Sequence, residues 1–337
     1  MEKVNVLIIQ PFPEPMVQKL AQLSPLLNIT VRKVQKIEEV ADVLGEMDVL
    51  YTFAALPEPE AAPRLRWVQL HSAGADMILQ HPLYTHSEVM FTTTSGIHAI
   101  QMAEYVLALM LAFAHRVPRM LEDQEAGVWT DSRWKRYVPD ELYGATIGIL
   151  GYGSIGRQVA YLARTFGMRV LALKRDVRRL DNSHYSQPDV GDPQAEIPDM
   201  IYPEDALHSF VKECDYVIVT VPLTGSTRHL IDASVLDAMK PKSILINIAR
   251  GDVIDEQALI NALVAGKIGG AGLDVFSEEP LPRTSPLWQL PNVILSPHIA
   301  GFSEHYDERA IDVFSENLKR FLAGEPLLNL VDREHDY

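Results

Sequence analysis

Apolar residues occur along this chain in short, nearly continuous runs, and segments of helical periodicity separate the runs. Runs rich in Val, Ile and Leu are typical of strands that are buried on both faces of a parallel sheet. In the first part of the chain the predicted strands are 4–9, 29–34, 49–53, 67–70 and 89–92, and the predicted helices are 14–23 and 37–44. This alternation predicts an α/β fold with a parallel sheet between layers of helices.

A second series of the same kind begins at Thr146. Its predicted strands are 147–150, 169–173, 216–221, 243–248, 270–274 and 293–296, with helices between them, for example 155–165 and 257–265. Residues 181–203 interrupt the series with several prolines and aspartates, so we predict a surface loop or small hairpin there. A last helical pattern runs from Ser303 to Leu322. The length of 337 residues favours two domains.

The longest helical segment, residues 98–115, is apolar around nearly its whole circumference. A helix without a polar face has to be buried, either between domains or between subunits. We favour the second position and expect a homodimer formed through this helix.

Charge and cysteine content restrict the classes of function. Thirty Lys and Arg residues against 45 Asp and Glu give a formal net charge of −15, which repels nucleic acid and anionic lipid, so we expect neither partner. The single cysteine, Cys214, opens an apolar run and predicts a buried, inert thiol in a reducing compartment. No signal peptide or membrane-length apolar run is visible, so we expect a cytoplasmic protein. The eleven histidines lack metal-ligand spacing, and we expect no metal site.

The most specific local signal is the motif Gly151-Tyr152-Gly153-Ser154-Ile155-Gly156. It follows a predicted strand directly and opens a predicted helix, which is the context of a dinucleotide-binding loop. Gly151 permits the tight turn, Gly153 lets the backbone approach a pyrophosphate, and Gly156 lets the helix pack close to the strand. Ser154 and Ile155 belong to the helix N-terminus, whose N–H groups attract phosphate. The alternative is a glycine-rich turn that binds nothing.

The next predicted strand ends in Lys174 and Arg175, with Arg178 and Arg179 close behind. NAD-binding proteins usually place an acidic residue here to bind the ribose 2′-hydroxyl. The nearest acid, Asp176, lies beyond that position. Cations at this place suit a 2′-phosphate, so we favour NADP(H). NAD(H) remains possible if the cations form a solvated basic turn.

Three polar residues, Arg250, Glu279 and His298, lie in segments that follow predicted strands. Taken singly, each could be a surface or packing residue. Together with the glycine motif and the segment 220–224, however, they resemble in order and spacing the D-isomer-specific 2-hydroxyacid dehydrogenase family. This resemblance covers nearly the whole chain. It implies two doubly wound parallel-sheet domains: a Rossmann cofactor domain (99–298) inserted into a flavodoxin-like substrate domain (1–98 and 299–337).

The resemblance also implies the reduction of small 2-oxo acids to D-2-hydroxy acids. His298 would be the proton donor, Glu279 would bind its other ring nitrogen, and Arg250 would bind the carboxylate and carbonyl oxygens of the substrate. Backbone N–H groups of Ala73 and Gly74 would bind the substrate carboxylate. Further implied cofactor contacts lie at Val221, Pro222, Thr227, Ala249, Asp274, Ala300 and Gly301.

Three questions stay open at this point. The protein could be an NAD-dependent dehydrogenase of the same family. It could also be a dinucleotide sensor similar to the corepressors that share this fold, although a sensor does not need the full set of Arg250, Glu279 and His298. Trp129 and Trp134 are expected to pack against the chain, with the lining of a neighbouring subunit's substrate pocket as the alternative.

Overall fold

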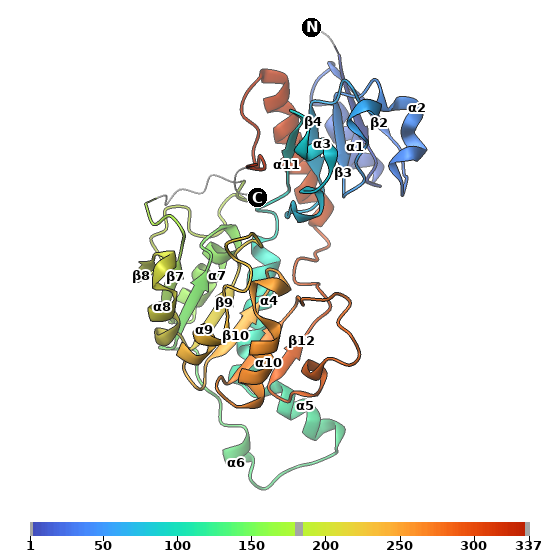
Figure 1. The fold of residues 1–337 in the computed structure, drawn as a ribbon. Helices are drawn as coiled ribbons and strands as arrows, with labels where there is room; N and C mark the ends of the chain where they lie inside the picture. Colours follow the sequence, from blue (N-terminus) through green and yellow to red (C-terminus); the bar gives the residue numbers. More distant parts are fainter. Residues whose placement is uncertain (1–2, 179–184, 334–337) are drawn as a thin grey trace. The chain divides into compact units, whose positions relative to one another are not determined.

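A computed structural model describes residues 3–178 and 185–333. Within these residues the chain divides into two compact units (Figure 1), the first made of 3–97, 185–187 and 303–333 and the second of 98–178 and 188–302. The sequence placed the domain limits at 98/99 and 298/299. The compact units change over at 97/98 and 302/303, and residues 185–187 join the first unit.

The first unit is built on a five-stranded parallel sheet with the strand order β2-β1-β3-β4-β5. This is the flavodoxin-like order, in which the winding reverses beside the first strand. Helices α1 (Glu14–Ala21) and α11 (Tyr306–Ala323) pack on one face, and α2 (Ala41–Leu44) and α3 (Pro82–Thr85) pack on the other. The strands are β1 (Val4–Ile8), β2 (Leu27–Val31), β3 (Val49–Thr52), β4 (Trp67–Leu70) and β5 (Met90–Thr92).

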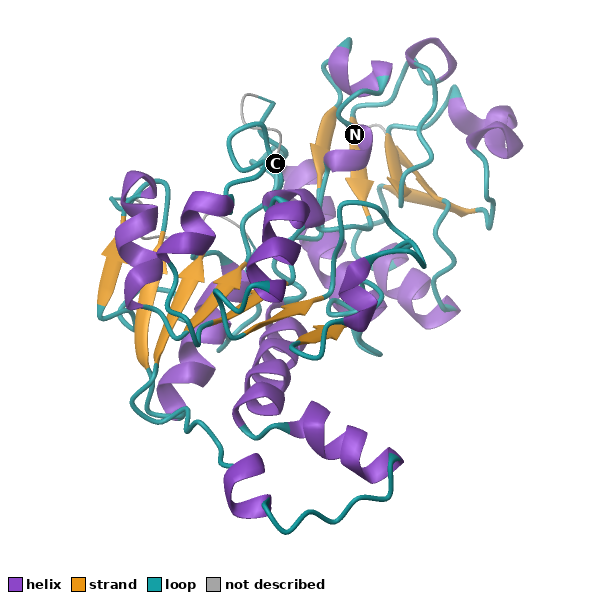
Figure 2. Ribbon diagram, turned by 60° about the horizontal axis from the view of Figure 1, so that its bottom comes forward, coloured by secondary structure: helices purple, strands orange, loops and turns teal. Residues whose placement is uncertain are grey.

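The second unit is built on seven parallel strands in the order β12-β11-β10-β9-β6-β7-β8. This is the doubly wound order of dinucleotide-binding domains, and its winding reverses between β6 and β9. Figure 2 shows this sheet with its helices on both faces. The strands are β6 (Thr146–Leu150), β7 (Arg169–Leu173), β8 (Met200–Tyr202), β9 (Tyr216–Val219), β10 (Ile244–Asn247), β11 (Gly270–Leu273) and β12 (Val293–Leu295).

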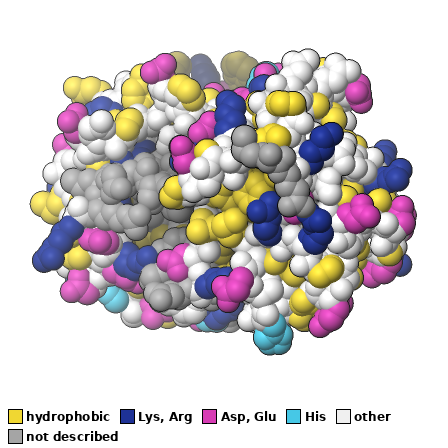
Figure 3. Space-filling view, turned by 90° about the horizontal axis from the view of Figure 1, so that it is seen from above, with side chains coloured by type: hydrophobic (Ala, Val, Ile, Leu, Met, Phe, Trp, Pro, Cys, Tyr) yellow, Lys and Arg dark blue, Asp and Glu magenta, His cyan; other side chains and the backbone are white. Residues whose placement is uncertain are grey.

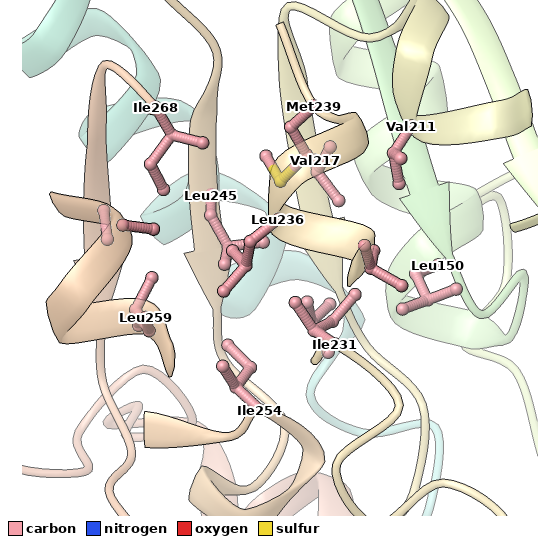
Figure 4. Close-up of a cluster of buried hydrophobic side chains, with 14 of the residues drawn as sticks. Leu150, Val211, Val217, Ile231, Leu236, Met239, Leu245, Ile254, Leu259 and Ile268 are labelled. Atoms are coloured by element: carbon pink, nitrogen blue, oxygen red, sulfur yellow. The ribbon is translucent and has the colours of Figure 1, made fainter. Parts of the chain in front are cut away.

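Side chains of the second sheet alternate between two apolar layers because successive residues of a strand face opposite sides. Ile147 and Ile149 pack beneath α4 (Ala99–Ala114) and α7 (Ser154–Thr165). Val217 and Leu245 point the other way, toward α8 (Leu207–Glu213), α9 (Ala233–Ala238) and α10 (Glu256–Val264), as Figure 4 shows. The two predicted parallel sheets, each buried on both faces, are confirmed.

Several local predictions were incomplete. The predicted loop 181–203 contains β8, which pairs in parallel with β7, while residues 181–184 lie outside the described part. The predicted helix 37–44 is a 3-10 turn (Ile37–Val40) followed by α2. Cys214 is buried, as predicted, and burial raises the pKa of its thiol to about 12.

Helix α4 packs against α7 and β10 within the second unit. After it, α5 (Val117–Glu125), α6 (Arg133–Arg136) and the segment between them project from this unit (Figure 1). Trp129 and Trp134 in this arm are 85% and 77% exposed, so the expectation that they pack against the chain was wrong. Among the described residues, no single helix is long and apolar enough to cross a membrane. Only the pair α4 and α5, bent by 65°, passes that test together.

The face drawn in Figure 3 carries Asp and Glu side chains interspersed with Lys and Arg side chains. Such mixing of both signs accompanies the net charge of −15. That nucleic acid is not a partner stays a prediction.

Candidate active site

Because the strands of the second sheet are parallel, six chain segments that follow them lie together at the carboxyl ends of the strands, which we call the carboxyl edge. The glycine motif follows β6, the cationic turn follows β7, and Val221 and Pro222 follow β9. Ala249 and Arg250 follow β10. The remaining candidates of this unit follow the last two strands: Asp274 and Glu279 after β11, and His298, Ala300 and Gly301 after β12. Ala73 and Gly74 follow β4 of the first unit.

The glycine motif has the backbone geometry of an anion-binding loop. Gly151 has a φ of +100°, and a Cβ there would lie 2.9 Å from Val221 Cγ1. A Cβ on Gly156 would lie 2.3 Å from the carbonyl oxygen of Gly151. Gly153 is the N-cap of α7, no side chain caps that helix, and no atom lies within 4 Å of where its Cβ would be. The first N–H groups of α7, at Ser154 and Ile155, therefore fit a dinucleotide pyrophosphate.

Two threonines shape the neighbouring loop after β9. Thr220 Oγ1 donates to the carbonyl oxygen of Gly151 at 2.7 Å, which ties this loop to the glycine motif. Thr227 Oγ1 donates to the carbonyl oxygen of Pro222 at 2.6 Å and accepts from the N–H of Thr224 at 2.8 Å. The side chain of Thr227, a predicted cofactor contact, thus closes its own loop. Thr220 was not among the candidates, although it opens the segment 220–224.

The cationic turn after β7 is open to solvent. Lys174 is half-buried, and Arg175 and Arg178 are exposed. Asp176 Oδ1 accepts from the backbone N–H of Arg178 at 2.9 Å, so this carboxylate is engaged in its own turn. Arg179 lies outside the described residues.

His298 and Glu279 form a direct pair. His298 Nδ1 lies 2.7 Å from Glu279 Oε2, and Glu279 Oε1 accepts from the backbone N–H of Phe276 at 3.0 Å. Both oxygens of the Glu279 carboxylate therefore form a hydrogen bond. Since the pair uses Nδ1 of His298, its Nε2 is the nitrogen that can bind a substrate. Nearly half of the His298 side chain is exposed.

Arg250 lies on the loop after β10, next to the loop that carries Glu279. A Cβ on Gly251 would lie 1.9 Å from the carbonyl carbon of Phe276, so only glycine permits this approach of the two loops. Arg250 Nη1 donates to the carbonyl oxygen of Ala249 at 2.9 Å. The guanidinium thereby belongs to the same edge of the sheet as the His298–Glu279 pair.

Asp274 is 1% exposed and binds the loop that carries His298. Its Oδ1 accepts from Ser296 Oγ at 2.6 Å and from the N–H of Ile299 at 2.9 Å, and its Oδ2 accepts from the N–H of Ala300 at 2.9 Å. Both carboxylate oxygens thus serve this loop. A contact between Asp274 and a cofactor stays a prediction.

In the first unit, His71 anchors the loop that contains Ala73 and Gly74. Its Nδ1 lies 2.9 Å from the hydroxyl of Tyr51, and Tyr306 donates its hydroxyl to the carbonyl oxygen of His71 at 2.8 Å. Burial lowers the pKa of His71 to about 4, so the ring is neutral near pH 7.

Comparison with known proteins shows which family has this arrangement of strands and motifs. A model of the NAD-binding domain of the D-isomer specific 2-hydroxyacid dehydrogenases matches residues 107–300, more than half of the chain. The chain belongs to this family. The predicted resemblance is therefore confirmed, and the protein is an NAD(P)-dependent oxidoreductase.

Relatives of this dehydrogenase match most of its length. A glyoxylate reductase from Thermococcus onnurineus is 35% identical over 311 residues, which cover 91% of this chain and 86% of the relative. A glyoxylate reductase from Korarchaeum cryptofilum is 38% identical over 277 residues, covering 82% and 78%. The D-isomer specific 2-hydroxyacid dehydrogenase from Xanthobacter autotrophicus, solved in complex with NADPH and MES, is 29% identical over the full length of both chains, with a TM-score of 0.79.

Proposed function

We propose that this dehydrogenase reduces small 2-oxo acids to D-2-hydroxy acids with NADPH. The observation that carries the proposal is the His298–Glu279 pair at 2.7 Å, at the carboxyl edge of a dinucleotide-binding sheet. Relatives that carry the name glyoxylate reductase support the substrate class.

Bound NADPH would supply a hydride to the carbonyl carbon of the substrate. His298 then delivers a proton from Nε2 to the carbonyl oxygen, which becomes the hydroxyl of the product. Glu279 accepts from Nδ1–H and so fixes the orientation of the ring. Arg250 presents two parallel donors to the substrate carboxylate and carbonyl oxygens, and polarises the carbonyl. In the first unit, the backbone N–H groups of Ala73 and Gly74 are further candidates for binding a substrate carboxylate.

The preference for NADPH rests on the turn after β7. Lys174, Arg175 and Arg178 offer three cations to a 2′-phosphate, whereas the nearest acid, Asp176, lies beyond the position at which NAD-binding proteins usually hold the ribose 2′-hydroxyl. The Xanthobacter relative was solved with NADPH, which agrees with this assignment. NAD(H) remains the alternative cofactor, since the family model describes an NAD-binding domain.

A homodimer through α4 completes the proposal. The arm that follows α4 exposes several large apolar side chains, which monomeric proteins rarely gather in one place: Met120, Leu121, Val128, Trp129, Trp134 and Val138. Light scattering of the wild type and of a Trp129→Ser, Trp134→Ser variant tests this. We expect a dimer that the double substitution weakens, and a monomeric wild type would contradict the proposal.

Initial rates of NADPH and NADH oxidation with glyoxylate, hydroxypyruvate, pyruvate, phenylpyruvate and 2-ketopantoate test the reaction. We expect turnover with NADPH, and we expect His298→Ala to abolish it while the variant still binds NADPH. Lys174→Ser with Arg175→Ser should raise the KM for NADPH by about tenfold per cation and leave that for NADH unchanged. Lys212→Ser, an exposed charge on α8, is the matched control.

Three outcomes are informative. A preference for NADH would overturn the role of the cationic turn and leave the catalytic residues in place. Full activity of His298→Ala would overturn the mechanism. Tight NADPH binding without turnover of any 2-oxo acid would favour a dinucleotide sensor.

A further inference from the structure

The backbone at His298 has an unusual conformation. Its φ is +54°, in the left-handed region that residues other than glycine rarely occupy. Such a conformation costs free energy and persists only where neighbouring bonds maintain it. The orientation of the His298 ring therefore depends on what anchors the loop between β12 and Gly301.

Asp274 provides most of that anchor. Its carbonyl oxygen accepts from the N–H of His298 at 2.8 Å. Its buried carboxylate accepts from Ile299, Ala300 and the hydroxyl of Ser296. Four hydrogen bonds thus join one residue to the loop, and the carboxylate must stay fixed for the ring to stay fixed.

Tyr105 of α4 extends this network. Its hydroxyl forms a hydrogen bond with Ser296 Oγ. A serine hydroxyl has one hydrogen, and Ser296 donates it to Asp274, so Tyr105 must be the donor in the first bond. The result is a relay in which Tyr105 donates to Ser296 and Ser296 donates to the carboxylate of Asp274. Successive hydrogen bonds of this kind polarise and strengthen one another.

Helix α4 contacts the same loop at a second point. Gln101 Nε2 donates to the carbonyl oxygen of Gly301 at 3.1 Å, and residues four apart lie on the same face of a helix. Burial and the charge of Asp274 together raise the pKa of the Tyr105 phenol, which keeps it a donor at neutral and mildly alkaline pH. One face of α4 is thus bonded to both ends of the loop that carries His298.

We propose that Tyr105 is a positioning residue for His298, acting through Ser296 and Asp274. The inference rests on the proposed function, in which His298 delivers a proton to the substrate. Tyr105 touches no reacting atom in this scheme. It fixes the carboxylate that fixes the loop, and a small displacement of an acid–base group is enough to slow proton delivery.

Tyr105→Phe removes only the hydroxyl and keeps the ring in place. We expect kcat to fall by about tenfold, because the relay orients the acid–base group of the chemical step. The KM for NADPH should rise by a smaller factor, because the glycine motif and the cationic turn are left unchanged. Ser296→Ala should cause a similar loss, and the double variant should lose no more than either single variant, since both break one relay. Ser296→Thr keeps a hydroxyl and should restore most of the activity.

Hydrogen exchange at residues 296–301 gives a second readout that needs no turnover. We expect faster exchange there in Tyr105→Phe than in the wild type. Tyr202→Phe is the matched control, since it removes a phenol hydrogen bond to Glu213 elsewhere in the same unit, and it should change neither kcat nor exchange in this loop.

Wild-type kcat and wild-type exchange in Tyr105→Phe would overturn the inference, as would single losses that multiply in the double variant. An absence of turnover in the wild type would instead contradict the proposed function. Hydrogen exchange would still decide in that case whether Tyr105 orders the loop.

Discussion

The buried imidazole of His71 predicts a specific dependence of stability on pH. The side chain is 9% exposed, and burial lowers its pKa to about 4. In the unfolded chain the pKa of the same group is about 6.5. Below that value the unfolded chain binds a proton that the folded protein does not, so the stability contributed by the neutral ring is present above pH 6.5 and is lost as the pH falls toward 4.

The magnitude follows from these two pKa values. Each unit of difference corresponds to about 1.4 kcal/mol, so lowering the pH from 7 to 5 should cost about 2 kcal/mol from this group, and the full loss near pH 4 should be about 3 kcal/mol. Asp307 Oδ1 lies 3.6 Å from His71 Nε2 and favours the charged ring. This distance is too long for a strong hydrogen bond, so burial outweighs it, and the stated losses are upper values.

Urea unfolding of the wild type and of His71→Asn at pH 7 and pH 5 measures this difference. Trp67 is fully buried in the first unit, whereas the other three tryptophans are exposed, so replacing those three by Phe makes the fluorescence specific for this unit. We expect the wild type to lose about 2 kcal/mol more than His71→Asn between the two pH values. Equal losses would refute the assignment of a neutral, buried imidazole.

Three shorter predictions concern the second unit. Arg250→Lys should raise the KM for the 2-oxo acid by about tenfold, since Lys cannot present two parallel donors, and steady-state kinetics measure this; an unchanged KM would remove Arg250 from the substrate site. Gly156→Ala should weaken NADPH binding measured by calorimetry, because its Cβ would lie 2.3 Å from the carbonyl oxygen of Gly151; wild-type affinity would contradict the close packing. Glu279→Gln should lower kcat by about tenfold in rate assays, since it replaces a charged acceptor at His298 by a neutral one; wild-type kcat would show that the carboxylate is dispensable.

Much of the fold could be predicted from local pattern. Strands β4 and β7 have the bounds that their apolar runs indicated, because runs buried on both faces carry the same signal along their whole length. Strand β8 was missed, since its three residues follow a segment rich in Pro and Asp and are extended only because they pair with β7. The place of residues 185–187 in the first unit likewise has no local signal. Tyr185 is attached there by its backbone N–H, which donates to Asn329 at a separation of 144 residues.

In the candidate site, too, some residues could be predicted from local motifs and others could not. Glu279 and His298 were named as candidates because the family motifs specify them, and the structure brings His298 Nδ1 and Glu279 Oε2 to 2.7 Å from each other. Ser296 and Tyr105 were not found, since a serine before a Pro-His pair and a tyrosine in an apolar helix look like ordinary packing residues. Their role depends on tertiary contacts with Asp274, which no local pattern records.

The discontinuity of the first unit has a consequence for synthesis on the ribosome. Helix α11 covers one face of the five-stranded sheet, where Phe314 and Leu318 pack against residues such as Val6 and Trp67. These N-terminal strands leave the ribosome between about 230 and 315 residues before that helix is complete. The second unit is nearly continuous in sequence, so its core can form before α11 is synthesised. The first unit cannot cover this apolar face of its sheet until α11 has been made. The nascent chain therefore presents that face to chaperones until α11 has been synthesised.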